Sequence, residues 1–219
     1  MIATMSSLGA LQVDGVFCIS LEEREDRRTL LLREFADADL NIEFYLAKRD
    51  TNPERGCFTS HQACAALALE RGYKNVLILE DDATLVGVKG STIQRINHFL
   101  RSRQPDIFFL GVTLGTLWLT WSWNVARCRA KGTHAYIMSD SACRKLLTFE
   151  YAEQPIDRLY SKHFKAYCAF PMICQQQPEE INPSDISSGS TMLFWKNNWK
   201  RQYREILRNV GKTLIRKDF

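Results

Sequence analysis

The sequence predicts an α/β protein built around a layered sheet in a single domain. Three short apolar runs are bounded by polar residues, as in central strands buried on both faces; they are residues 75–79, 106–111 and 135–138. Segments with helical spacing alternate with these runs, which favours helices layered on a sheet. Ligands of such sheets collect at the carboxyl ends of the strands, so we expect the functional site there.

The other elements follow in chain order. The apolar run 16–19 suits a buried strand, and a charged turn at 22–26 leads into a helix through Phe35. Alanines and leucines predict a helix over residues 59–71, which Gly72 is placed to stop. Further helices are expected at residues 93–100 and 141–147.

The composition is that of one globular domain with a basic tail. The 219 residues are 45% apolar and 25% charged and contain no repeat or flexible linker. In residues 195–219, eight basic residues stand against Glu205 and Asp218, which gives this tail a charge of +6 and leaves −2 on the rest of the chain. We therefore expect a domain over residues 1–194 and a basic tail over 195–219. The nearly neutral body argues against a nucleic-acid-binding domain.

The seven cysteines and the lack of a targeting signal predict a reduced, cytoplasmic protein. The cysteine number is odd and no CxxC motif occurs, so a disulfide framework is not indicated. No secretory signal is recognisable in residues 1–14, and the apolar stretch 107–119 is too short and too interrupted by glycine to span a bilayer.

Three consecutive carboxylates, Glu80, Asp81 and Asp82, directly follow the strand expected at 75–79. Like charges this close repel, and burying them beside an apolar strand is costly without compensation. A hard divalent cation, Mg²⁺ or Mn²⁺, would compensate them and would also bridge phosphate oxygens. Because side chains alternate along an extended backbone, we expect Glu80 and Asp82 on one face and Asp81 on the other. A solvated acidic turn fits the spacing equally well.

A GCFTSH segment leads into the helix expected from Thr59. Thr59 or Ser60 would cap that helix, whose N-terminus can receive an anion. If the helix begins earlier, Cys57, His61 and Cys64 lie on one face as an incomplete set of soft metal ligands. Buried cysteines beside a hydrogen-bonded histidine are the more common arrangement.

Arg24, Arg27 and Arg28 follow the first strand, with Asp26 among them. Guanidinium groups at the carboxyl end of a strand suit a diphosphate, which they bind bidentately. A cluster of ion pairs on a helix surface is an equal alternative.

In their shared order along the chain, these segments resemble glycosyltransferase family 25, which includes lipopolysaccharide glycosyltransferases and collagen galactosyltransferases. The resemblance extends over roughly residues 15–190. It rests on Ile19-Ser20-Leu21 with Arg24, Asp26 and Arg27, on the GCFTSH segment, and on residues 77–82, 106–111, 132–137, Asp157 and 171–175. Ser20 and Thr59 stand where the family usually has Asn and Leu.

The resemblance implies a GT-A-like α/β/α fold with a mixed sheet, a UDP-sugar donor, inversion at the anomeric carbon, and Mn²⁺ or Mg²⁺ as cofactor. In that case Asp82 is the leading metal ligand, and Glu80 contacts the metal or the donor. Asp81 faces the nucleotide, while Arg24 and Arg27 assist the leaving diphosphate.

The remaining expected site residues surround this centre. Asp157 is the expected base for the acceptor hydroxyl, although a helix-cap aspartate paired with Arg158 would have the same sequence. His134 and Tyr136 begin a buried strand, where a structural role is equally compatible. The further donor-side residues are Ser60, His61, Ser187 and Ser188, the last two in a polar stretch that either closes over the donor or forms a surface loop.

Aromatic residues suggest the acceptor side, where a glycan, a lipid-linked sugar or a protein would bind. We expect at least one of Trp118, Trp121 and Trp123 to stack on a sugar ring. In the tail, apolar residues recur at helical spacing between basic ones, which predicts an amphipathic helix that lies on an anionic membrane or packs on the body. These residues are Trp195, Trp199, Tyr203, Ile206, Val210 and Leu214.

Two other functions are compatible with the same residues. A metal-dependent phosphohydrolase would use the acidic triplet, but the sequence offers no phosphate-loop motif for it. A non-catalytic binding module would keep the fold and leave the basic tail as the working part.

Overall fold

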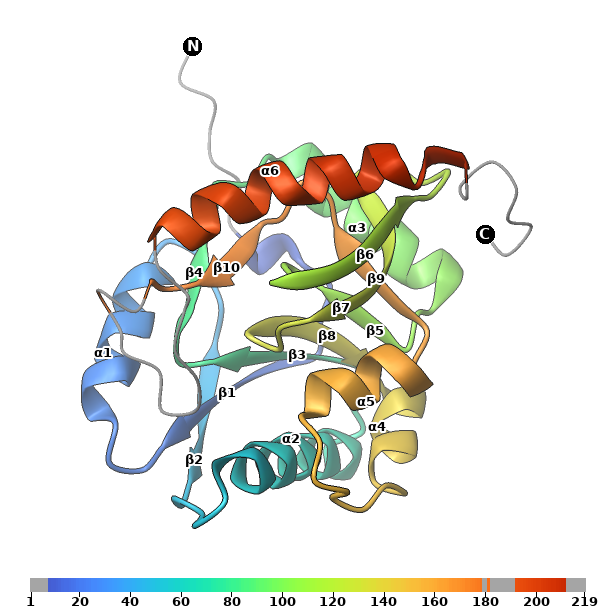
Figure 1. Ribbon diagram of the computed structural model, residues 1–219. Coiled ribbons are helices and arrows are strands. Elements are labelled where there is room, and N and C mark those ends of the chain that lie inside the picture. The colour runs from blue at the N-terminus through green and yellow to red at the C-terminus, as the bar shows by residue number, and fades with distance from the viewer. Residues whose placement is uncertain (1–7, 179–180, 182–191, 212–219) are drawn as a thin grey trace.

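The computed structural model describes residues 8–178, 181 and 192–211 and confirms an α/β protein with a large central mixed sheet (Figure 1). The strands are β1 (Gly15–Leu21), β2 (Ile42–Ala47), β3 (Asn75–Glu80), β4 (Ala83–Leu85), β5 (Ile107–Phe109), β6 (Leu114–Leu119), β7 (Val125–Lys131), β8 (Ala135–Ser139), β9 (Ala166–Ala169) and β10 (Cys174–Gln176). The helices are the 3₁₀ turn η1 (Leu8–Ala10), α1 (Glu25–Glu34), α2 (Pro53–Glu70), α3 (Gly90–Arg103), α4 (Asp140–Leu146), α5 (Ile156–His163) and α6 (Met192–Arg208).

Eight strands form the central sheet in the order β2-β1-β3-β8-β5-β9-β7-β6, and β4 pairs with β10 outside it. Strands β2, β1 and β3 are parallel, whereas β8 runs antiparallel between β3 and β5. Since Ile19 of β1 is in register with Glu80 of β3, the residues that follow these two strands emerge at the same edge of the sheet. This register brings the arginines that follow β1 beside the acidic triplet that follows β3.

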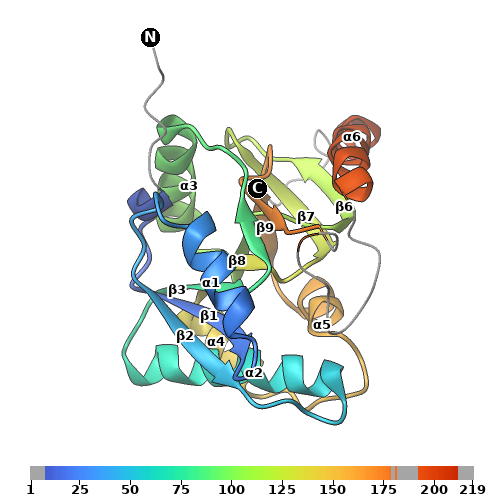
Figure 2. The same cartoon turned by 90° about the vertical axis from the view of Figure 1, so that its left-hand side faces the viewer.

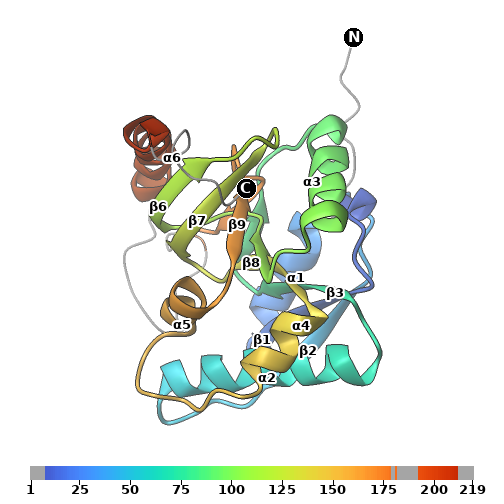
Figure 3. The same ribbon diagram turned by 90° about the vertical axis from the view of Figure 1, so that its right-hand side faces the viewer.

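Apolar side chains on the two faces of the sheet form two buried clusters. One cluster contains Phe58 of α2, Leu146 of α4 and Leu159 of α5, and the other contains Leu31 of α1 and Ile93 of α3. The views from the two sides place α2, α4 and α5 together at one end of the molecule and α3 and α6 at the other (Figure 2; Figure 3). Within the described residues, no helix is both long enough and apolar enough to cross a membrane.

Helix α2 begins at Pro53, so the expected start at Thr59 is wrong. The side chain of Asn52 accepts a hydrogen bond from the Arg55 N–H (3.1 Å), and Pro53 follows it as the first helical residue. An N-cap asparagine followed by proline is a strong helix-start signal. The earlier start adds more than a full turn, and that turn carries Cys57.

Helix α6 packs three amide side chains, from Asn198, Gln202 and the following Asn209, against the sheet edge beside the apolar Ile206. Asn198 and Gln202 donate hydrogen bonds to the Val112 carbonyl (3.2 and 2.9 Å), and Asn209, just past the helix, donates to the Leu117 carbonyl (2.9 Å). Leu117 lies in the edge strand β6, whose carbonyls lack a partner strand on one side, and Val112 lies in the loop before it. The amides of α6 and Asn209 satisfy both carbonyls. Ile206 is buried as expected, whereas Tyr203 and Val210 are exposed.

Candidate active site

A cavity of about 540 Å³ opens at the edge of the sheet where β1, β2 and β3 end. Its size is in the range of small-molecule and cofactor sites. Its walls come from the ends of these strands, the first turns of α2, the β7–β8 turn, the start of α5 and β10. The sequence-predicted residues that line it are Arg27, Ser60, His61, Glu80, Asp81, Asp82 and Asp157.

At the floor of this cavity Asp81 and Asp82 contact Arg27, whereas Glu80 contacts His61. Strand β3 ends at Glu80, and Asp81 and Asp82 form a turn. Arg27 of α1 lies 2.8 Å from Asp81 Oδ1 and 3.8 Å from Asp82 Oδ2. The expectation that Asp81 and Asp82 point to opposite faces is therefore wrong, because the alternation of an extended strand stops one residue before them.

The environment of Asp82 fits a divalent cation. Burial and the neighbouring carboxylates of Glu80 and Asp81 raise the pKa of Asp82 to about 7, although Arg27 opposes them. Gln176 donates to Oδ2 (3.2 Å), while the buried Oδ1 has no hydrogen-bond partner among the described residues. A buried carboxylate oxygen without a partner is costly, and a hard cation is the ligand that would satisfy it.

Glu80 faces a chain of buried polar side chains instead. Its Oε1 lies 3.3 Å from His61 Nε2 and accepts a hydrogen bond from the Thr133 hydroxyl. His61 Nδ1 lies 2.7 Å from the Tyr136 hydroxyl, which in turn lies 3.0 Å from that of Tyr160. Burial alone would raise the pKa of Glu80, but the hydrogen bond and charge of His61, together with Thr133, lower it.

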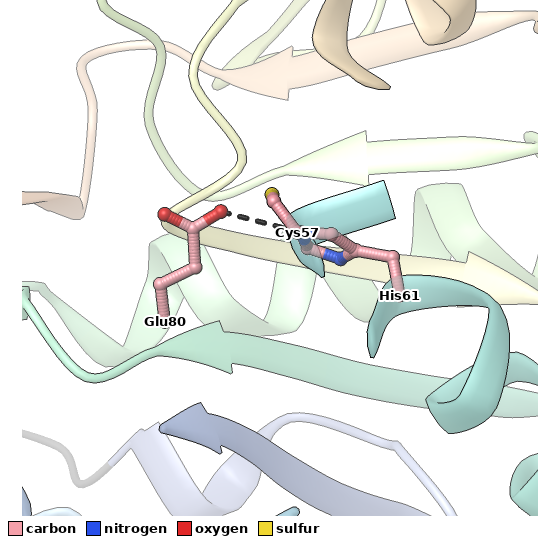
Figure 4. A group of neighbouring side chains, drawn as sticks. All are labelled: Cys57, His61 and Glu80. Carbon is pink, nitrogen blue, oxygen red and sulfur yellow. Dashed lines mark ion pairs between the residues drawn. The ribbon is translucent and has the colours of Figure 1, made fainter. Parts of the chain in front are cut away.

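Cys57 completes this arrangement from the first turns of α2. One ligand atom each from Cys57, His61 and Glu80 lies within 4.8 Å of the other two, and the three side chains converge in Figure 4. Cys64, which the sequence placed on the same helix face, lies instead in the apolar core. The set that sequence spacing suggested therefore forms with Glu80 in place of Cys64.

Asp157 stands on the α5 side of the cavity. Its Oδ2 accepts a hydrogen bond from the Gly132 N–H (3.3 Å), and its buried Oδ1 has no hydrogen-bond partner among the described residues. Burial raises the pKa of Asp157, and the charge of Glu80 adds to this effect, while the Gly132 N–H and Lys131 oppose it. Pro155 is the N-cap of α5, so Asp157 is not the cap residue.

Of the other expected donor-side residues that the structure describes, Ser60 lines the cavity, whereas Arg24, His134 and Tyr136 do not. Arg24 forms an ion pair with Asp26 (3.0 Å) and does not line the cavity. His134 and Tyr136 are fully buried beneath it. Ser60 lines the cavity, but it lies inside α2 and its hydroxyl donates to the Gly56 carbonyl (2.7 Å), so it caps no helix. Ser187 and Ser188 lie outside the described residues.

Sequence reasoning missed two residues of the site. It also expected a sugar-stacking tryptophan, but the three candidates do not line the cavity. Thr133 and Gln176 contact Glu80 and Asp82, and only the β7–β8 turn and the pairing of β10 with β4 reveal their positions. Trp118 is buried in β6, whereas Trp121 and Trp123 are 72% and 80% exposed on the β6–β7 turn, away from the cavity lining.

Several solved structures are weakly similar to this chain. A197 from STIV shares 10% identity over 81% of this chain and 97% of that chain, with a TM-score of 0.47. A glycosyltransferase involved in the glycosylation of the major capsid of PBCV-1 shares 9% identity over 87% and 99%, with a TM-score of 0.44. UDP-glucose pyrophosphorylase complexed with UDP-glucose shares 8% identity over 87% and 81%, with a TM-score of 0.45.

No curated protein sequence matches the chain. The segment that carries α2, β3 and the acidic triplet is recognised at the level of a family. Residues 44–118 match the model of glycosyltransferase family 25 (LPS biosynthesis protein), which confirms over this segment the resemblance expected from the sequence and supports a transferase.

Proposed function

We propose that this protein is a metal-dependent, inverting glycosyltransferase that moves a hexose from a UDP-sugar to a glycan, lipid-linked or protein acceptor. The observation that carries the proposal is the pairing, within one cavity, of a carboxylate suited to a cation and a second carboxylate suited to accept a proton. Asp82 supplies the first and Asp157 the second. The family match over residues 44–118 supports sugar transfer as the reaction.

Asp82 would hold Mn²⁺ or Mg²⁺, which when bound neutralises negative charge on the leaving diphosphate. The contacts of Glu80 lie with His61 and Thr133, so we assign Asp82 the leading role. Arg27 is fixed by Asp81 at the floor of the cavity, where its guanidinium adds positive charge beside the expected diphosphate. This arrangement favours departure of the nucleotide toward the β1–β3 edge.

Asp157 accepts the proton of the acceptor hydroxyl in this proposal. An ionised carboxylate with an unpartnered oxygen is available for that proton, and general-base help of this kind contributes about 10²–10⁴-fold to the rate. Inversion requires the acceptor to attack from the side opposite the leaving group. Asp157 comes from α5, which packs on one apolar cluster of the sheet, and Arg27 comes from α1, which packs on the other. Both side chains line the cavity, and this separation suits the requirement.

The test is release of UDP from a panel of UDP-sugars, measured with and without Mn²⁺ or Mg²⁺. We expect turnover that depends on the metal, and a loss of at least about 10²-fold in Asp82→Ala. Asp37→Ala, which changes an exposed carboxylate, is the matched control and should retain full turnover. Unchanged, metal-independent turnover in a folded Asp82→Ala protein would reject the assignment.

A further inference from the structure

The cluster of Cys57, His61 and Glu80 differs chemically from the carboxylates around Asp82. It combines a sulfur, a nitrogen and an oxygen ligand, whose nearest atoms all lie within 4.8 Å of one another. Cys57 and His61 come from successive turns of α2, and Glu80 comes from the end of β3 (Figure 4). All three residues line the cavity, so an ion at their centre has a route in from solvent.

The spacing of the three ligand atoms is close to that of a tetrahedral transition-metal site. With metal–ligand bonds of about 2.0–2.3 Å, two ligands of one tetrahedral ion lie roughly 3.3–3.6 Å apart. His61 Nε2 and Glu80 Oε1 are already 3.3 Å apart. A shift of Cys57 Sγ by about 1 Å closes the remaining gap. Cys57 is half-buried and borders the cavity, which leaves room for this change of rotamer.

Buried hydroxyl groups hold the two less flexible ligands in place. The Tyr136 hydroxyl, supported by Tyr160, lies against His61 Nδ1, and the Thr133 hydroxyl donates to Glu80. A hydroxyl can donate or accept, so Tyr136 can accept from Nδ1–H and leave the Nε2 lone pair for an ion. Partners of this kind on the far nitrogen are the usual support of a metal-binding histidine.

We propose that Cys57 Sγ, His61 Nε2 and a carboxylate oxygen of Glu80 form a binding site for a divalent transition-metal ion, with Zn²⁺ the expected occupant. Mixed sulfur and imidazole ligands suit Zn²⁺, whereas Mg²⁺ and Mn²⁺ prefer oxygen. When the ion binds, Cys57 releases its thiol proton to solvent through the cavity as the sulfur–metal bond forms, and any proton on His61 Nε2 leaves by the same route, since metal ligands must be deprotonated. Three protein ligands leave a fourth position facing the cavity. The site shares no ligand with the cation proposed at Asp82, although the charge of Glu80 acts on both.

Co²⁺ titration of the full chain, after treatment with a chelator, tests this site directly. Co²⁺ reports a cysteine ligand through a thiolate-to-metal charge-transfer band in the near ultraviolet. We expect one Co²⁺ per chain with this band, and displacement of Co²⁺ by Zn²⁺. Cys57→Ser should abolish the band and weaken Zn²⁺ binding by at least about 10-fold, since even loss of a supporting partner costs 10–100-fold.

Two control variants make the outcome decisive. Cys64→Ala removes the other cysteine on the same stretch of α2, which lies in the core, and should keep the band. Asp82→Ala should also keep it while losing sugar transfer, which separates this site from the proposed reaction. Absence of stoichiometric uptake, or a band that survives in Cys57→Ser, would overturn the proposal.

Discussion

The two ends of the acidic triplet lie two residues apart in sequence but are compensated in different ways. Asp81 and Asp82 meet the guanidinium group of Arg27, a permanent charge. Glu80 meets the His61 ring at 3.3 Å and the Thr133 hydroxyl, and these two neighbours lower its pKa despite burial. The end of β3 creates this division, because the backbone leaves the extended conformation after Glu80.

This difference in partners determines which kind of cation each end of the triplet can accept. At the Asp81–Asp82 end the guanidinium group of Arg27 contacts both carboxylates and the charge of Arg24 also acts on Asp81, yet the pKa of Asp82 stays raised at about 7. At the Glu80 end the partners are neutral or titratable, and a cysteine lies beside them. The first end is therefore suited to a hard cation held by oxygen, and the second to a softer ion held by mixed ligands.

Replacement of Arg27 by glutamine should have the largest effect on stability. Arg27 and Asp81 have side chains only 8% and 6% exposed. Removing one partner of a buried ion pair typically costs about 3–5 kcal/mol, because the other charge stays buried. Urea denaturation followed by circular dichroism would measure the loss of unfolding free energy.

Arg24→Gln provides the matched control for that measurement. Its partner Asp26 has a side chain 63% exposed, and exposed pairs contribute about 0–1 kcal/mol. If both variants lose the same small amount, Arg27 does not compensate the Asp81–Asp82 end and the comparison between the two ends fails.

Tyr136→Phe should weaken the Glu80 end by a smaller amount. The change removes the hydroxyl that lies 2.7 Å from His61 Nδ1 and leaves a buried ring nitrogen without its partner. Such a loss costs about 1–3 kcal/mol, and the same denaturation experiment measures it. Tyr167→Phe removes a hydroxyl from another buried tyrosine, which forms no hydrogen bond among the described residues, and should change stability little. Equal losses in both variants would show that the Tyr136 contact adds nothing.

The sequence predicted the Asp81–Asp82 end better than the Glu80 end. Buried apolar runs at β1 and β3 predicted strands, and the carboxyl ends of parallel strands meet at one edge of a sheet, so the arginines and carboxylates were expected together. The contact between His61 and Glu80 depends on the start of α2, which the Asn52-Pro53 signal fixes and which sequence reasoning placed six residues too late. The turn at Asp81–Asp82 also has no glycine or proline to reveal it.

Local sequence patterns also failed to predict the β6 edge of the sheet. The strand runs that led to α/β layering are confirmed in β3, β5 and β8. The antiparallel β6–β7 pair and the burial of amides on α6 were not expected, because both depend on which strand forms the edge of the sheet. Pairing between strands distant in the sequence determines which strand forms the edge, and the spacing of apolar residues within a strand does not reveal it.

The smallest effect concerns the reach of the Glu80 charge across the cavity. Asp157 acts as a base, and Asp82 holds the cation, only when ionised. Burial together with Glu80 raises the pKa of both carboxyl groups, so the rate should fall with decreasing pH at a higher pH than for an ordinary aspartate. Glu80→Gln removes one raising charge and should move this acid limb of kcat/KM to lower pH, by less than about one pH unit. The measurement is a pH profile with Mn²⁺ as the only added metal. Asp81→Asn, whose carboxylate is held by Arg27, should move the limb less. A limb that stays in place in Glu80→Gln would mean that the charge of Glu80 reaches neither Asp82 nor Asp157.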